Sequence, residues 1–219
     1  TIDTKKYDFR SIKNFINNTV RENYLFNSTI NGIEESDFIL LIGTNPRYEA
    51  TMVNARIRKA YTNNNTKVIS LNDVGNLTYG YESLDGKTQT IVDIIEKKND
   101  ISKLIIDSKK PMIIFGESFL NIKSANYLFN LFKQFLSKNK KITDDWNPIN
   151  ILSVDASTVG NLDLGIVEKS NTLIEELNEN KFEIVFLIGQ DNLNFKKKDE
   201  FIIYQGSHGD KGAEIADII

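Results

Sequence analysis

Short apolar runs alternate with longer segments of helical period along most of the chain. We predict strands at the apolar runs, which lie at residues 38–42, 67–71, 112–115, 149–154, 184–188 and 201–204. Several runs are continuously apolar, which is typical of strands buried on both faces. Helical spacing predicts helices that begin near residues 45 and 124 and helices at 91–97, 101–107 and 171–180. Strands that alternate with helices predict an α/β fold with a parallel sheet covered on both faces.

The pattern is interrupted at residues 139–148, NKKITDDWNP, where charged residues and turn formers surround Trp146. We therefore expect a first α/β lobe at residues 23–142 and a second at 143–219. Residues 1–22 are expected to form an N-terminal extension or a lead-in helix. The last residues, Ile218 and Ile219, are apolar and have no polar tail after them, so we expect the chain to be part of a larger domain.

The composition is that of an ordinary globular protein, with 40% apolar residues, 26% charged residues and a formal net charge of -3. Nothing in it favours nucleic acid, because the lysine clusters at 138–141 and 196–198 are short and read as solvated. The absence of cysteine excludes thiolate ligands within these 219 residues, and a single histidine excludes a multi-histidine metal centre. No apolar run approaches the ~20 residues that cross a bilayer, so we expect no direct membrane insertion.

The turn after the first predicted strand, GTNPRYEA at residues 43–50, carries the signals of a helix start. Asn45 suits the N-cap and Pro46 the first helical position. Such a helix would direct its free N–H groups toward the ligand crevice of an open α/β sheet. Arg47 in the first turn opposes the helix dipole by a few tenths to ~1 kcal/mol, so an acidic group is expected beside it. We predict a carboxylate of this chain or of a partner rather than a ligand phosphate.

Two phosphate-binding patterns are incomplete. A dinucleotide fingerprint needs three glycines, whereas this turn has Gly43 alone and the first acid after the next strand is Asp73. In GYESLDGKT, five residues separate Gly80 from Gly86, where a P-loop has four. We expect neither a dinucleotide site nor an NTPase site.

A hydrolase pattern is also incomplete. GESFL follows a strand but lacks the second glycine of a nucleophile elbow, which leaves Ser118 as a weak nucleophile candidate. The only histidine base is His208, in the fragment SHGD with Asp210. We expect no catalytic residue and no metal site in this chain.

The segment NYLFNSTINGIEESDFILLIGTNPRYEATMVNARIRKAY at 23–61 resembles the molybdopterin-oxidoreductase-like region of the largest iron–sulfur subunit of respiratory complex I, NADH:ubiquinone oxidoreductase. Further blocks of that region follow in order, and they are LTYGYESLD, KKPMIIFGESFL, DWNPINIL, NLDLG, VFLIGQD and FIIYQGSHGDKGAEIADII. The strings TNPRYEATMVNARIRK and IYQGSHGDKGAEIAD are long and specific. The resemblance covers nearly the whole chain beyond about residue 20.

The resemblance implies parallel-sheet, Rossmann-like lobes of the formate dehydrogenase and molybdopterin oxidoreductase type. In those enzymes the turn that Gly43, Asn45 and Pro46 match helps to hold a molybdopterin nucleotide. The complex I subunit is understood to keep this scaffold without the cofactor. We therefore expect a vestigial motif and no cofactor in this chain.

The resemblance also implies a non-catalytic structural role in the peripheral arm of complex I. We expect one piece of a split subunit, docked on a separate cluster-bearing chain, with iron–sulfur clusters and FMN in partner chains. The expected location is the matrix side of the mitochondrial inner membrane, or the cytoplasmic face of a bacterial plasma membrane. Trp146, Arg47 and His208 are candidate contact residues. The alternatives are a domain that retains molybdopterin and a free-standing module that binds an anion at Arg47.

Overall fold

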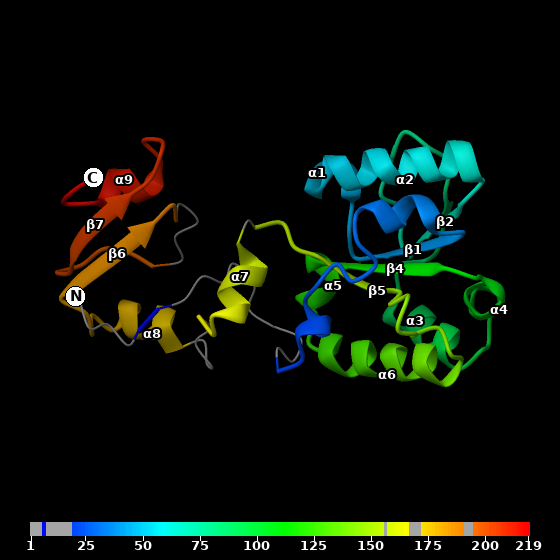
Figure 1. Ribbon diagram of the computed structural model, residues 1–219. Coiled ribbons are helices and arrows are strands. Elements are labelled where there is room, and N and C mark those ends of the chain that lie inside the picture. Colours follow the sequence, from blue (N-terminus) through cyan, green and yellow to red (C-terminus); the bar gives the residue numbers. More distant parts are fainter. Residues whose placement is uncertain (1–5, 8–18, 156, 167–171, 191–194) are drawn as a thin grey trace. The chain divides into compact units, whose positions relative to one another are not determined.

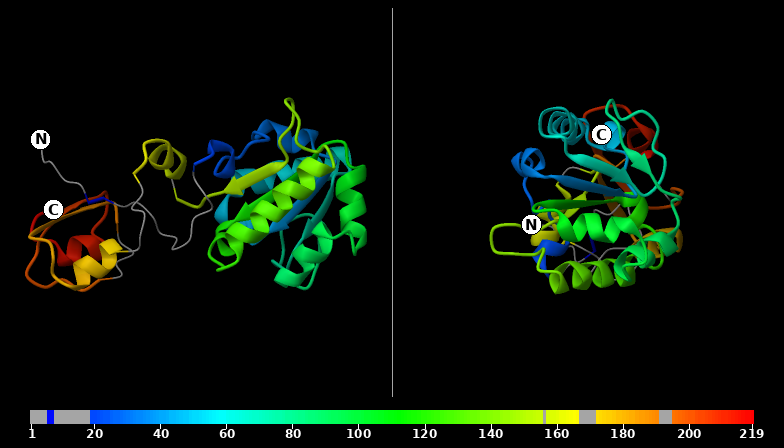
Figure 2. Two further views of the ribbon diagram at one scale, coloured as in Figure 1. Left: turned by 90° about the horizontal axis from the view of Figure 1, so that it is seen from below. Right: turned by 90° about the vertical axis from the view of Figure 1, so that its right-hand side faces the viewer.

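The computed structural model describes residues 6–7, 19–155, 157–166, 172–190 and 195–219. The chain forms two compact units, which are described separately (Figures 1 and 2). The large unit is Ile12–Val159, and the small unit combines Thr1–Ser11 with Gly160–Ile219. The lead-in helix expected within residues 1–22 lies largely outside the described residues, which include a short 3-10 helix, η1 (Arg21–Asn23).

The large unit contains a five-stranded parallel sheet in the order β3-β2-β1-β4-β5. Its strands are β1 (Phe38–Ile42), β2 (Lys67–Ser70), β3 (Glu82–Ser83), β4 (Pro111–Gly116) and β5 (Ile149–Leu152). The helical elements described after η1 in this unit are η2 (Asn31–Glu35), α1 (Pro46–Glu49), α2 (Thr51–Asn64), α3 (Thr88–Ile95), α4 (Asp100–Asp107), α5 (Glu117–Leu120) and α6 (Ala125–Lys138), and α7 (Thr158–Asp163) spans the division. The predicted α/β fold with a parallel sheet is confirmed.

The six predicted strands are all present, with ends that differ by up to two residues. β3 was not predicted, because Glu82 and Ser83 are exposed at the sheet edge and form no apolar run. The sequence places a lobe boundary between residues 142 and 143, whereas the two units divide at 159 and 160. The later division follows from β5, which pairs with β4 and so belongs to the first sheet.

The sheet has an apolar core on each face because its central strands are buried throughout. Phe38, Leu40 and Ile42 of β1 pack on one face with α3, α4 and α6. Ile39 and Leu41 pack on the other face with α2 and η2. Figure 1 shows α2 above the sheet and α3 and α6 below it. This arrangement is the one that parallel strands require, since both faces must be removed from water.

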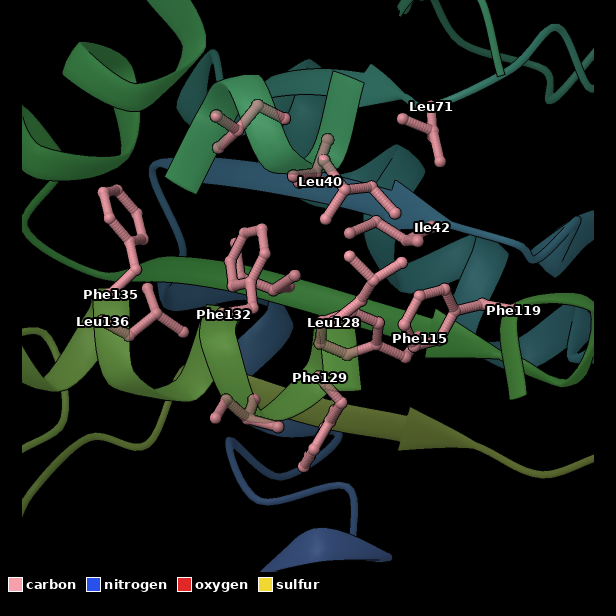
Figure 3. Packing of buried hydrophobic residues seen from close by; sticks show 14 of the residues in the cluster. Leu40, Ile42, Leu71, Phe115, Phe119, Leu128, Phe129, Phe132, Phe135 and Leu136 are labelled. Atoms are coloured by element: carbon pink, nitrogen blue, oxygen red, sulfur yellow. The ribbon is translucent and has the colours of Figure 1, made fainter. Parts of the chain in front are cut away.

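An aromatic cluster joins β4 to α5 and α6 (Figure 3). The ring centroid of Phe115 lies 4.9 Å from that of Phe119, 5.4 Å from Phe129 and 5.8 Å from Phe132. Phe132 in turn lies 5.8 Å from Phe135. Tilted and edge-to-face pairs of this kind contribute ~0.5–1.5 kcal/mol each beyond their buried area. One strand residue therefore fixes the positions of two helices.

Trp146 belongs to the core, although the sequence made it a candidate contact residue. Its side chain is 9% exposed and packs with the cluster beneath α2. The indole Nε1 donates to the carbonyl oxygen of Pro111 at 2.8 Å, which satisfies its polar atom. Lys110 Nζ lies 5.2 Å from the ring centroid, within cation–π range.

The outer edge of β5 is closed by the segment that precedes β1. Phe26 forms an antiparallel bridge with Asn150, and the N–H of Ile151 donates to the carbonyl of Leu25 at 2.9 Å. Asn150 is fully buried, and its side-chain oxygen accepts from the N–H of Ser28 at 2.8 Å. Its amide nitrogen donates to Ser28 Oγ and to the carbonyl of Pro148, both at 3.0 Å. The segment therefore occupies part of the hydrogen-bonding edge of β5.

The small unit contains α8 (Thr172–Asn178), the parallel strands β6 (Ile184–Ile188) and β7 (Phe201–Gln205), and α9 (Lys211–Ile215). Residue 171, the first of the predicted helix at 171–180, lies outside the described residues. Leu187, Ile202 and Tyr204 are buried on one face of this sheet, against α9. Its core is much smaller than that of the large unit.

We predict that Asn150→Ala lowers the free energy of unfolding by ~2–3 kcal/mol, because it leaves the buried Ser28 N–H without an acceptor. Denaturant unfolding of the purified chain measures the change. The control is Asn126→Ala at an exposed position of α6, where a change within ~0.5 kcal/mol is expected. Equal effects of the two substitutions would contradict the structural role given to Asn150.

Candidate functional site

The candidate site lies where β1 and β4 end side by side in the large unit. From β1 the chain continues to β2 and β3 on one side, and it then returns to β4 and β5 on the other. The carboxyl ends of such neighbouring strands form the usual ligand crevice of an open α/β sheet. Here Ile42 pairs with Phe115, so the turn at Gly43 and the turn at Gly116 emerge next to each other.

Two glycines allow these turns to touch. A Cβ atom on Gly43 would lie 2.4 Å from the backbone nitrogen of Phe119, and Gly43 also has a positive φ of 65°. A Cβ atom on Gly116 would lie 2.4 Å from the Cβ of Thr44 and 2.5 Å from the carbonyl oxygen of Gly43. These distances are too short for any side chain. The crevice between the two strand ends is consequently filled by the turns themselves and by α5.

The predicted helix start is confirmed. Asn45 has an extended backbone and its side-chain oxygen accepts from the N–H of Arg47 at 3.2 Å, while Pro46 occupies the first helical position. The helix is shorter than expected, because α1 ends after one turn at Glu49. Ala50 interrupts it with φ −154° and ψ 76°, and α2 begins at Thr51. Since dipoles add along a helix, one turn supplies little of the N-terminal field that the sequence suggested.

Glu49 occupies the hydrogen-bond donors of this turn. Its carboxylate accepts from Thr44 Oγ1 at 2.5 Å and from the N–H of Asn45 at 3.0 Å. The amide of Asn45 donates to the carbonyl of Val74 at 2.8 Å, which ties the turn to the loop after β2. Sequence reasoning missed Glu49, although an acid shortly after an N-cap residue is a known capping signal. Two donors of this turn, the hydroxyl of Thr44 and the N–H of Asn45, are thus already bonded within the protein.

Glu117, the first residue of α5, adds a second carboxylate at the same place. Its Oε1 accepts from the N–H of Val154 at 2.9 Å. Partial burial raises the pKa of Glu117, the bond from Val154 opposes this effect, and the negative charges of Asp155 and Glu49 increase it. The site therefore carries negative potential, which is unfavourable to a phosphate group.

Arg47 does not contact a carboxylate of the described chain. Its Nη1 donates to the backbone carbonyl of Asn76 in the loop after β2. The expected intrachain carboxylate is therefore wrong for the described residues, and a backbone oxygen takes its place. A backbone carbonyl oxygen accepts a hydrogen bond from a guanidinium but does not neutralise its charge. A carboxylate of a partner chain stays a prediction.

The incomplete motifs do not form ligand loops. Between Gly80 and Gly86 the chain makes the edge strand β3, and a Cβ on Gly80 would lie 2.6 Å from the hydroxyl of Tyr61. Ser118 is exposed on α5 of the large unit. His208 and Asp210 belong to the small unit, where Nδ1 of His208 is hydrogen-bonded to Ser207 Oγ at 2.8 Å. No group of three or more metal-ligating side chains occurs among the described residues.

The sheet, its strand order and the turn at Asn45 and Pro46 place the chain in a class of α/β proteins with a ligand-type crevice. A family model, Molybdopterin oxidoreductase, matches residues 3–219, and the chain belongs to this family.

The chain is also similar to individual proteins that carry names. The chain is 41% identical over 202 residues to the NADH-ubiquinone oxidoreductase 75 kDa subunit of Reclinomonas americana, covering 91% of the chain and 29% of that protein. It is 38% identical over 203 residues to the mitochondrial 78 kDa subunit of Candida albicans, covering 91% and 27%. It is 36% identical over 205 residues to the mitochondrial NADH dehydrogenase [ubiquinone] iron-sulfur protein 1 of Solanum tuberosum, covering 93% and 27%. These relatives confirm the resemblance recognised in the sequence, and the chain spans under a third of their length.

Contacts within the protein occupy the point where the two turns meet. Gly43 and Gly116 bring the turns into direct contact, so protein atoms fill the space between the strand ends. Glu49 already accepts from the Thr44 hydroxyl and the Asn45 N–H, and its charge opposes a phosphate.

None of the helices among the described residues has the length and apolar character of a membrane span.

We predict that Gly43→Ala destabilises the fold by ~2–5 kcal/mol, since it combines left-handed strain of ~1–2 kcal/mol with overpacking of ~1–3 kcal/mol. Gly75→Ala is a matched control, because Gly75 has a similar φ of 76° but nothing within 4 Å of an added Cβ. The control should lose only the ~1–2 kcal/mol of stability that comes from left-handed strain. Thermal and denaturant unfolding compare the two variants, and equal losses would show that the contact with α5 is not limiting.

We predict that Glu117→Gln stabilises the protein at neutral pH by up to ~1 kcal/mol, because it removes a partly buried charge and keeps the acceptor for Val154. The folded pKa is raised above the ordinary value of 4.5, so the wild type loses stability as pH rises between these two values. The advantage of the variant should therefore disappear below pH 4.5. Unfolding curves at several pH values test this, and an advantage that grows in acid would contradict it.

Proposed function

We propose that this chain is a non-catalytic structural part of the peripheral arm of respiratory complex I. It supports the polypeptides that carry electrons from NADH to quinone and carries no electron-transfer group itself. The observation that carries the proposal is the closed crevice, in which Glu49 bonds the donors of the Asn45 turn and Phe119 packs against Gly43. A chain of this family whose ligand crevice is filled by its own side chains can keep a structural role without the cofactor.

The names of the relatives support a place for this chain in complex I. Two of the three are named as subunits of an NADH-ubiquinone oxidoreductase, and the third is named as an iron–sulfur protein of NADH dehydrogenase. The 219 residues contain no cysteine, so iron–sulfur clusters ligated by thiolates would belong to polypeptide outside the matched region. We propose that this chain is one piece of a split large subunit and docks on a separate cluster-bearing piece, on the matrix side of the mitochondrial inner membrane.

The location in the assembly is tested on the native complex. We expect the chain to co-migrate with NADH dehydrogenase activity on a native gel. Intact mass and terminal sequencing of the same band should give a polypeptide separate from the one that carries the clusters. A chain that migrates alone would contradict the role in complex I, and one continuous polypeptide with both regions would contradict the split.

The absence of a pterin role is tested by chemistry. We expect molybdenum and tungsten far below one atom per chain, and no pterin fluorescence after oxidative extraction of the purified chain. The control is an extract of a pterin-containing formate dehydrogenase treated in parallel. Stoichiometric metal together with pterin would favour the alternative, an oxidoreductase domain that retains a molybdopterin cofactor.

A further inference from the structure

One face of the small unit's sheet is apolar and exposed. Side chains alternate along a strand, and the register pairs Ile184 with Phe201 and Phe186 with Ile203, so these four share a face with Ile188. The exposed fractions are 56% for Ile184, 47% for Phe186, 73% for Ile188 and 43% for Phe201. We call these five residues the open face. None of them carries a charge, although the exposed Gln205, which pairs with Ile188, adds one polar residue to the same face.

The other face of the same two strands is covered. Leu187, Ile202 and Tyr204 are buried there and pack against α9. The large unit shows what a parallel sheet in this chain normally has, since helices cover both of its faces. Parallel sheets exposed on one face are rare, because their strands have apolar side chains on both sides. Among the described residues of the small unit, a core therefore covers one face of the sheet only.

The open face extends beyond the two strands. Ile218 forms a parallel bridge with Ile203, which places the two side chains on the same face, and Ile218 is 52% exposed. Contiguous apolar surface of this kind on a soluble protein marks an interaction site, whereas single exposed hydrophobic residues do not. The absence of charge within it requires an equally apolar partner, because an unpaired charge buried there would be costly.

We propose that the open face is covered by an amphipathic helix of a second polypeptide, the one that supplies the part of the large complex I subunit outside the matched region. This inference rests on the proposed function. The match covers only 27–29% of the relatives' length, so most of each relative's sequence lies outside the matched region. A helix fits because helices are the elements that cover faces of parallel sheets, and apolar residues three and four positions apart would span both strands.

The occupant is identified by photo-cross-linking in the intact complex. Phe186 is replaced by p-benzoylphenylalanine, the assembled complex is purified and irradiated, and the adducts are mapped by mass spectrometry. We expect an adduct with an amphipathic helix of the cluster-bearing polypeptide. The control is the same replacement at Tyr127, which is 67% exposed on α6 of the large unit and should give no adduct with that helix. An adduct with a second copy, with this chain itself or with another subunit, or no adduct at all, would overturn the inference.

Substitution gives an independent measurement. Phe186→Asp and Ile188→Asp should each reduce the amount of this chain recovered in the complex at least tenfold, because each would bury a charge against the helix. Met52→Asp, at a position that is 73% exposed on α2, is the matched control and should leave recovery unchanged. Circular dichroism of each purified variant verifies that it folds.

The outcomes separate this inference from the proposed function. If wild-type chain fails to co-migrate with NADH dehydrogenase activity, the proposed function is wrong. If wild-type chain co-migrates and the Phe186→Asp and Ile188→Asp variants are recovered equally well, the role in complex I stands and the open face is not its docking surface.

Discussion

The large unit depends on the contact between the turns that follow β1 and β4. Gly43 and Gly116 have no side chains, and this allows the turns to approach closer than any Cβ atom would permit. The approach brings α5 over the strand ends, and Phe119 then reaches Phe115 at 4.9 Å between ring centroids. Through Phe115 the same contact positions α6, so the aromatic core and the closed crevice are two results of one constraint. A residue larger than glycine at either position would have to move backbone atoms.

Closure changes the electrostatics of the crevice as well as its shape. An open α/β sheet normally offers backbone donors and a helix dipole at this place. Here α1 is one turn long, Glu49 accepts from the donors of the Asn45 turn, and Glu117 adds a carboxylate whose pKa is raised by partial burial. The protein supplies its own anion where a ligand phosphate would otherwise be recognised.

The two units differ in how completely they bury their sheets. The five-stranded sheet has a core on each face, and the segment that bridges to Asn150 also protects its outer edge at β5. The two-stranded sheet has a core against α9 and apolar side chains such as Ile188 exposed on its other face. The first unit thus buries both faces of its sheet, whereas the described residues of the second bury one face of theirs.

Local sequence patterns were sufficient to predict much of the secondary structure of this protein. Apolar runs predicted β1 and the five other long strands, and the pair Asn45 and Pro46 predicted the start of α1, because burial and capping depend on neighbours along the chain. Long, specific strings of residues also identified the family. Tertiary structure alone decided the features that join distant segments. Gly43 packs against Phe119, Arg47 donates to the carbonyl of Asn76, and Trp146 is buried in the core. The periodic pattern of the sequence does not predict any of these contacts. The residues involved are far apart in sequence, so only the packing of helices on the sheet could bring them together and close the crevice.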